Sequence, residues 1–210
     1  MRNLVNDIIL GETDSAYIDA PFDEGKFKLG REGYEVISLR DNAMLRIQEG
    51  YGAEVSKEGN WTREGVLYLP DGRILLTKNN PMMHELEEAT FYLTLDRNRE
   101  YLGVVPDSQV QYALEDAVDL NGGAIPTNRF GEDPRTVFAF EDLAEDYGTF
   151  LNEGGIKNML MWLEQIQNEA FVRPLRLESL GYESSFYGCY SRESINSVLF
   201  KDRVRGIKKK

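Results

Sequence analysis

The sequence predicts an α+β protein in which an antiparallel β-rich first half packs against about three amphipathic helices in the second half. In the first half, short apolar stretches are separated by turn residues, which is typical of strands. In the second half, apolar residues recur at helical spacing. We expect three parts, residues 1–105, 106–200 and 201–210: a β-rich part, a mainly helical part with an aromatic irregular segment, and a basic C-terminal tail. The first two form one structural unit.

Two hairpins are predicted in the first half. Residues 33–48 contain two apolar stretches around a central polar turn, which indicates a short hairpin. Residues 66–77 give the clearer signal, because Pro70, Asp71 and Gly72 separate two apolar runs. Proline presets the φ angle of a turn, aspartate bonds the backbone just beyond it, and glycine adopts the positive φ that closes it.

Helical periodicity predicts three helices in the second half. The first begins at Asp107, a suitable N-cap, and continues with apolar residues at spacings of three and four up to the stop at Gly122. The second covers residues 141–151. The third covers residues 156–170 and has the most continuous apolar stripe.

Three shorter elements complete the prediction. Residues 90–95 alternate between apolar and polar positions, as a half-buried strand does. In the aromatic segment, we expect a strand at residues 185–190 and a short helix at residues 194–200.

Charge is divided unevenly along the chain. Residues 201–210 hold six of the 24 basic residues and one of the 36 acidic residues, so a tail of net +5 follows a body of net −17. A short cationic arm of this kind can bind an acidic protein surface or a phosphate group. The predicted partner-binding residues are the six basic residues of the tail: Lys201, Arg203, Arg205, Lys208, Lys209 and Lys210.

Several kinds of site lack support in the sequence. The chain has one histidine, His84, and one cysteine, Cys189, which excludes a zinc site of the Cys and His type unless subunits share it. No glycine-rich phosphate-binding motif is present, so we expect no cofactor and assign no catalytic residue. No apolar run has the length of a membrane span or a signal peptide, so we expect a cytoplasmic or particle-associated protein without a membrane partner.

Acidic residues leave a metal site as an alternative. Two pairs of carboxylates at a spacing of four could bind a hard cation such as Mg²⁺, Mn²⁺ or Ca²⁺ on the helix predicted over residues 141–151. The competing interpretation is a solvated acidic face, because the helix dipole favours acids in the first turns. The candidate ligands are Glu141, Asp142, Glu145 and Asp146.

Together these patterns favour a non-catalytic structural or assembly protein that binds other protein subunits, its own copies or different ones. Such a protein fits a larger particle such as a virion. The alternatives are a carboxylate enzyme that uses a hard metal on a phosphate or sugar substrate, and nucleic-acid contact through the basic tail. The acidic body itself would repel phosphate.

Overall fold

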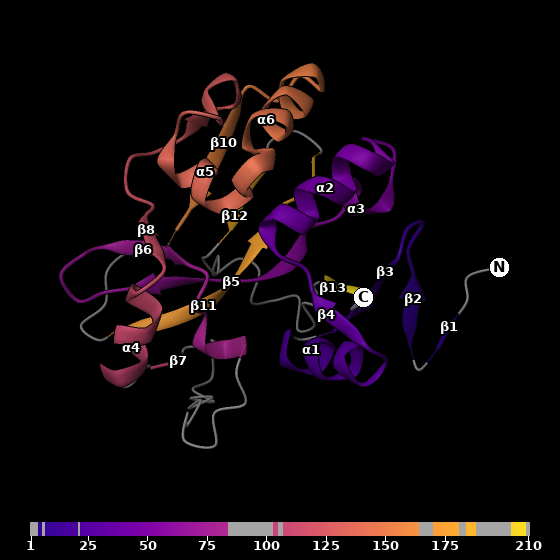
Figure 1. The fold of residues 1–210 in the computed structure, drawn as a ribbon, viewed down its shortest axis with the longest axis horizontal. Helices are drawn as coiled ribbons and strands as arrows, with labels where there is room; N and C mark the ends of the chain where they lie inside the picture. The colour runs from indigo at the N-terminus through magenta and orange to yellow at the C-terminus, as the bar shows by residue number, and fades with distance from the viewer. Residues whose placement is uncertain are drawn as a thin grey trace, which may run out of the picture.

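The computed structural model describes residues 4–5, 7–20, 22–83, 103–104, 107–163, 170–180, 184–187 and 203–208. Within these residues, thirteen strands form one mixed sheet, and helices lie on both of its sides (Figure 1). The predicted α+β class is therefore confirmed.

The strands are β1 (Leu4–Val5), β2 (Ile8–Leu10), β3 (Ser15–Asp19), β4 (Tyr34–Val36), β5 (Asn60–Tyr68), β6 (Ile74–Thr77), β7 (Gly103–Val104), β8 (Ala117–Asp119), β9 (Ile125–Pro126), β10 (Asn158–Trp162), β11 (Phe171–Leu177), β12 (Ser184–Tyr187) and β13 (Arg203–Lys208). Along the main path their order is β1-β2-β3-β13-β5-β11-β12-β10-β9. Strand β6 pairs with β5 and β8, β4 pairs with β13, and β7 pairs with β11.

The α-helices are α1 (Phe22–Arg31), α2 (Leu39–Glu49), α3 (Glu54–Lys57), α4 (Asp107–Leu114), α5 (Pro134–Phe140) and α6 (Ala144–Glu153). Three short 3₁₀ segments, η1 (Pro81–Met83), η2 (Thr127–Arg129) and η3 (Glu141–Leu143), lie beside them. Figure 1 shows α2, α5 and α6 on one side of β5 and β11, whereas α1 and α4 lie on the other side.

Alternation along β5 divides the interior into two main cores. Val66 and Tyr68 point into one core with α2, α5 and α6. Leu67 and Leu69 point into the other with α1 and α4. Successive strand side chains point to opposite faces, so a run that is apolar at every position is expected when both faces are covered. The central strands are therefore buried on both sides.

The last strand, β13, lies inside the sheet. It pairs antiparallel with β3 and β4 and parallel with β5. Val204 and Arg205 are both completely buried. In Figure 1 the C label accordingly lies beside β13 and β4, well away from the N label next to β1. Residues 203–208 of the basic tail are thus part of the folded body.

Two predicted elements are confirmed. Strands β5 and β6 form the hairpin expected over residues 66–77, and Gly72 has a φ of 92° in its turn. The Asp71 carboxylate accepts a bond of 3.1 Å from the Arg73 amide, as expected for a turn aspartate. The helix predicted over residues 141–151 is present as η3 followed by α6.

The hairpin predicted over residues 33–48 is wrong. Only the short strand β4 forms there, and the segment from Leu39 onward is helix α2. Ser38 begins this helix with a capping box, in which its hydroxyl accepts from the Asp41 amide and the Asp41 carboxylate accepts from the Ser38 amide. Such a cap satisfies two backbone donors at once and fixes the start of the helix.

The helices predicted from Asp107 and over residues 156–170 are also corrected. Helix α4 ends at Leu114, and the next apolar residues form β8, which pairs with β6. The other segment contains β10, which pairs with β9 and β12. In both places, hydrogen bonding to a neighbouring strand prevails over local helical periodicity.

The predicted arrangement, an antiparallel β-rich first half packed against helices in the second half, is not confirmed. Helices occur in the first half and strands in the second, and the β10–β12 and β13–β5 pairs are parallel. Strand β12 matches the start of the strand expected over residues 185–190. The elements expected over residues 90–95 and 194–200 lie outside the described residues. None of the helices in the described part of the chain is both long and apolar enough to cross a membrane.

Candidate binding site

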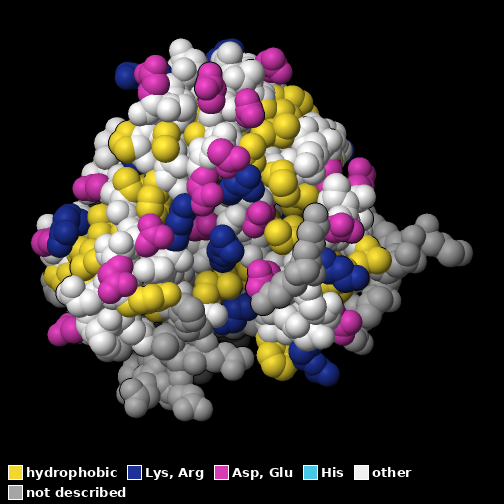
Figure 2. All heavy atoms as spheres, in the orientation of Figure 1, with side chains coloured by type: hydrophobic (Ala, Val, Ile, Leu, Met, Phe, Trp, Pro, Cys, Tyr) yellow, Lys and Arg dark blue, Asp and Glu magenta, His cyan; other side chains and the backbone are white. Residues whose placement is uncertain are grey.

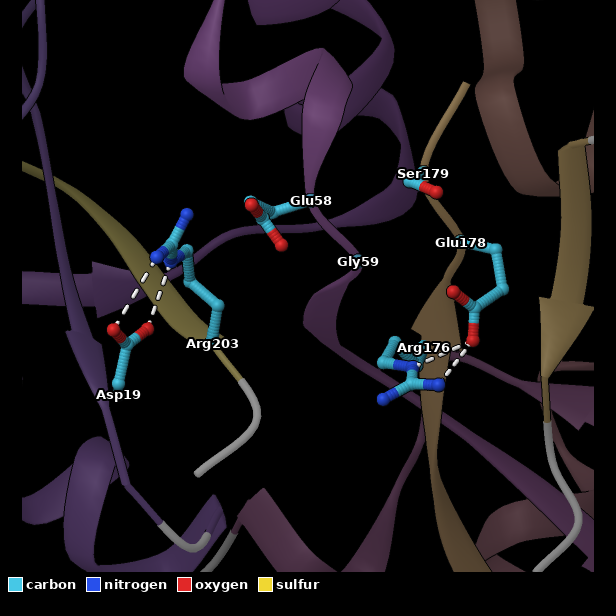
Figure 3. A pocket seen from close by; sticks show the side chains of 7 residues that line it. All are labelled: Asp19, Glu58, Gly59, Arg176, Glu178, Ser179 and Arg203. Carbon is cyan, nitrogen blue, oxygen red and sulfur yellow. Dashed lines mark hydrogen bonds and ion pairs between the residues drawn. The ribbon is translucent and has the colours of Figure 1, made fainter. Parts of the chain in front are cut away.

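A polar pocket lies where the ends of several strands meet. It has a volume of about 310 Å³, and Figure 3 shows the side chains around it. Strands β3, β11 and β13 and the segments beside α3 and β11 contribute its lining: Asp19, Glu58, Gly59, Arg176, Glu178, Ser179 and Arg203. Five of these seven residues carry a charge, so the pocket is suited to polar recognition.

One wall of the pocket is the ion pair between Arg203 and Asp19. The register of β13 and β3 places these two residues opposite each other. The Arg203 Nε and Nη2 atoms donate to the two carboxylate oxygens of Asp19 at 2.9 and 3.3 Å. The guanidinium also pairs with Glu54 and stacks 4.1 Å from the centre of the Tyr17 ring. These contacts fix Arg203 in one position.

The opposite wall is a second pair, between Arg176 and Glu178. The residues are two apart at the end of β11 and therefore point to the same side. The Arg176 Nε atom donates to Glu178 Oε1 at 2.8 Å, and a second bond runs from Nη2 to the same oxygen. The Arg176 guanidinium also lies 5.7 Å from the centre of the Trp61 ring.

Glu58 lies between these two pairs (Figure 3). Its side chain is exposed, and it makes no hydrogen bond or ion pair with the residues that the structure describes. Its neighbour Gly59 keeps the floor of the pocket open. A Cβ atom at Gly59 would approach Arg176 Cδ and Glu178 Oε2 to 3.1 Å each.

A fully buried arginine, Arg46 of α2, holds the backbone of two pocket residues, Glu58 and Glu178. Its Nη2 atom donates to the backbone carbonyls of Glu58 at 3.4 Å and Glu178 at 2.7 Å. Its Nε and Nη1 atoms donate to the Val55 carbonyl at 3.1 Å and the Tyr147 hydroxyl at 3.0 Å. Arg46 thereby ties α3, the end of β11 and α6 together, which fixes the backbone of two pocket residues.

The residues predicted to bind a partner are placed as follows. Arg205 is completely buried, where it donates to Asn60 Oδ1 at 3.0 Å and pairs with Glu54. Burial lowers the pKa of Arg205 to about 10. Lys208 is exposed at the end of β13, with its ammonium 5.8 Å from the Tyr34 ring. Lys201, Lys209 and Lys210 lie outside the described residues, as do His84 and Cys189.

Arg203 lines the pocket, whereas Arg205 is completely buried and bonded within the chain. Over the face seen in Figure 2, acidic and basic side chains lie side by side near the centre. Partner binding through Lys208 and the other lysines of the tail stays a prediction.

Of the four candidate metal ligands, Glu141 and Asp142 lie in η3, and Glu145 and Asp146 lie in the first turn of α6. Two of them are already paired with cations: Lys78 Nζ lies 2.6 Å from Glu141 Oε1, and Arg40 Nε lies 2.7 Å from Asp142 Oδ1. The hydrogen bonds from Arg40 lower the pKa of Asp142. Glu145 and Asp146 are exposed. Within the described part of the chain, no three His, Cys, Asp or Glu side chains form a group that could hold a metal ion.

Sequence reasoning did not select the pocket residues other than Arg203. They come from three separate segments, so no contiguous motif marks them. One signal was available in the sequence. In β11 and just beyond, charged and apolar residues alternate from Arg176 to Glu178, which is typical of a strand with one charged face.

No protein-family model and no curated protein matches the chain. Among solved structures, the chain is similar to one described as "Accommodation of massive sequence variation in Nanoarchaeota by the C-type lectin fold". The TM-score is 0.61, and the match covers 92% of this chain and 95% of that chain. The chain has the C-type lectin fold. At 15% sequence identity, the likeness concerns the fold and assigns no role to any residue.

Proposed function

We propose that this chain is a non-catalytic assembly protein, and that it binds another protein subunit at the polar pocket. The single observation that carries the proposal is that Arg46 holds the backbone of two pocket residues, Glu58 and Glu178. A site whose backbone is already ordered loses little conformational entropy when a partner binds, so more of the contact energy contributes to affinity. The paired charges of the pocket suit recognition by hydrogen bonds and ion pairs.

The fold gives further support. The similar solved structure is described as accommodating massive sequence variation. A scaffold that keeps its fold while its sequence varies can present different binding surfaces, because binding residues act from sites placed on a fold. We extend this property to the present chain as part of the proposal. The pairing of Glu141 and Asp142 with Lys78 and Arg40 gives the metal-enzyme alternative no comparable support.

The proposal is tested by photo-crosslinking in the cells that make the protein. A benzoylphenylalanine residue replaces Ser179 in the pocket, and a matched probe replaces Glu115, which is exposed elsewhere on the molecule. We expect a covalent adduct with a defined protein, identified by mass spectrometry, from the Ser179 probe and not from the Glu115 probe. The same adducts from both probes, or none from either, would contradict binding at the pocket.

A further inference from the structure

We infer that the pocket accepts a basic side chain, the guanidinium of an arginine or the ammonium of a lysine, from the partner protein. This inference rests on the proposed function, because it specifies the chemistry of the partner. It follows from the hydrogen-bonding capacity that the lining residues leave open, from their charge, and from the size of the cavity.

The hydrogen-bonding groups of the lining that remain available to a ligand are acceptors. Arg203 uses Nε and Nη2 on Asp19 and pairs with Glu54 through Nη1. Both hydrogen bonds from Arg176 to Glu178 reach its Oε1 atom, and no bond from the residues that the structure describes reaches Oε2. Glu58 uses neither carboxylate oxygen on the residues that the structure describes. A ligand that donates hydrogen bonds therefore complements this pocket.

The charge of the lining favours a cationic donor. Three carboxylates, those of Asp19, Glu58 and Glu178, face two guanidinium groups, so the lining has an excess of one negative charge. The buried cation Arg46 donates to backbone carbonyls and a hydroxyl, and these bonds satisfy it within the chain. At longer range, the net charge of −12 on the whole chain attracts a basic partner.

The geometry suits one charged head group. A volume of about 310 Å³ lies at the small end of ligand pockets, which matches one long side chain better than a folded element. Two acceptor carboxylates, Glu58 and Glu178, lie around the floor left open by Gly59. Hydrogen bonds between ionised partners are about twice as strong as neutral ones, so an inserted guanidinium or ammonium would supply the main anchor.

Three short peptides test the inference with the full-length chain: acetyl-Gly-Arg-Gly-amide, its lysine analogue, and its citrulline analogue, which is similar in shape to arginine but uncharged. Binding is measured by the NMR shifts of the Gly59 and Ser179 amides. We expect the arginine or lysine peptide to shift both amides, and the citrulline peptide to bind about tenfold more weakly or not at all. Added salt should weaken the charged complex.

Glu58→Gln is the decisive variant, because it removes the charge of an exposed side chain that supports no other residue. We expect it to weaken the charged peptide about tenfold. Glu145→Gln makes the same change at an exposed position outside the pocket and should have no effect. Equal binding of the citrulline peptide, or an unchanged affinity in Glu58→Gln, would overturn the inference.

The peptide and crosslinking experiments separate the two proposals. If the Ser179 probe captures a protein but no basic peptide binds, the partner is recognised by other chemistry and only this inference fails. If basic peptides bind but the probe captures no protein, the cation site stands and the assembly function fails.

Discussion

Replacing Glu64 with glutamine should remove a pH-dependent loss of folding stability that arises at the centre of the sheet. Glu64 lies on β5 with 1% of its surface exposed, and its Oε2 atom accepts a bond of 2.9 Å from the Leu39 amide at the start of α2. Burial raises the pKa of Glu64 from 4.5 to about 7, in spite of the bonds that favour the ionised form. The folded protein therefore holds this proton more tightly than the unfolded chain does.

The direction and size of the effect follow from linkage. Below pH 4.5 the carboxyl is protonated in both states and carries no penalty. As the pH rises to about 7 and beyond, the folded state must bury a carboxylate, so the stability contribution of the neutral form is lost. Each unit of pKa difference corresponds to about 1.4 kcal/mol, so the total loss is about 3 kcal/mol.

Urea unfolding of wild type and Glu64→Gln at pH 5 and pH 8 measures this loss. The difference between the two proteins isolates Glu64, because other titrating groups are common to both. Glutamine keeps an acceptor for the Leu39 amide, so the variant should be more stable than wild type at pH 8 by up to about 3 kcal/mol, and the gain should be much smaller at pH 5. Glu115→Gln, an exposed control, should show no such difference. A gain of the same size at both pH values would refute the reasoning.

Two further comparisons test packing around the pocket and β13 by urea unfolding. Arg46→Met leaves buried acceptors without a donor and should lower the free energy of unfolding by about 3 kcal/mol. Arg40→Met breaks a partly exposed ion pair and should lower it by less than about 1 kcal/mol. Equal losses of stability in the two variants would contradict the role of Arg46. In helix α1, a Cβ at Gly25 would lie 2.6 Å from Val204 Cβ, so Gly25→Ala should destabilise by about 1–3 kcal/mol. Gly30→Ala, which meets nothing within 4 Å in the same helix, should stabilise by about 0.5–1 kcal/mol, and a loss there would show that α1 packs differently.

Local sequence signals correctly predicted elements that are formed by contacts between neighbouring residues. The turn at Pro70, Asp71 and Gly72 closes on itself, so its residues alone predicted the β5–β6 hairpin. Helix α2 was missed because its burial hides the usual amphipathic pattern. Asn42 and Arg46 are buried with the apolar residues of this helix, and two polar residues in the core interrupt the apolar stripe that identifies a helix.

Pairing between strands that are far apart in the sequence accounts for the other predictions that were wrong or missing. Residues 158–162 fit a helical stripe, but their backbone groups bond to β9 and β12, and these neighbours come from elsewhere in the chain. The pocket depends on such pairings even more strongly. Asp19 and Arg203 meet only because β13 pairs with β3, and a single sequence gives no information about that register.

Part of the basic charge of the tail is neutralised inside the molecule. Arg203 and Arg205 of β13 have acidic partners in the body of the chain: Arg203 pairs with Asp19 and Glu54, and Arg205 also pairs with Glu54. A buried guanidinium without acceptors would cost several kcal/mol, so Glu54 and Asn60 stabilise Arg205 inside the sheet. The same pairing places Arg203 in the wall of the pocket. Attraction between the basic strand and the acidic body thus both stabilises the fold and builds the candidate binding site, while Glu58 remains for a cation from outside.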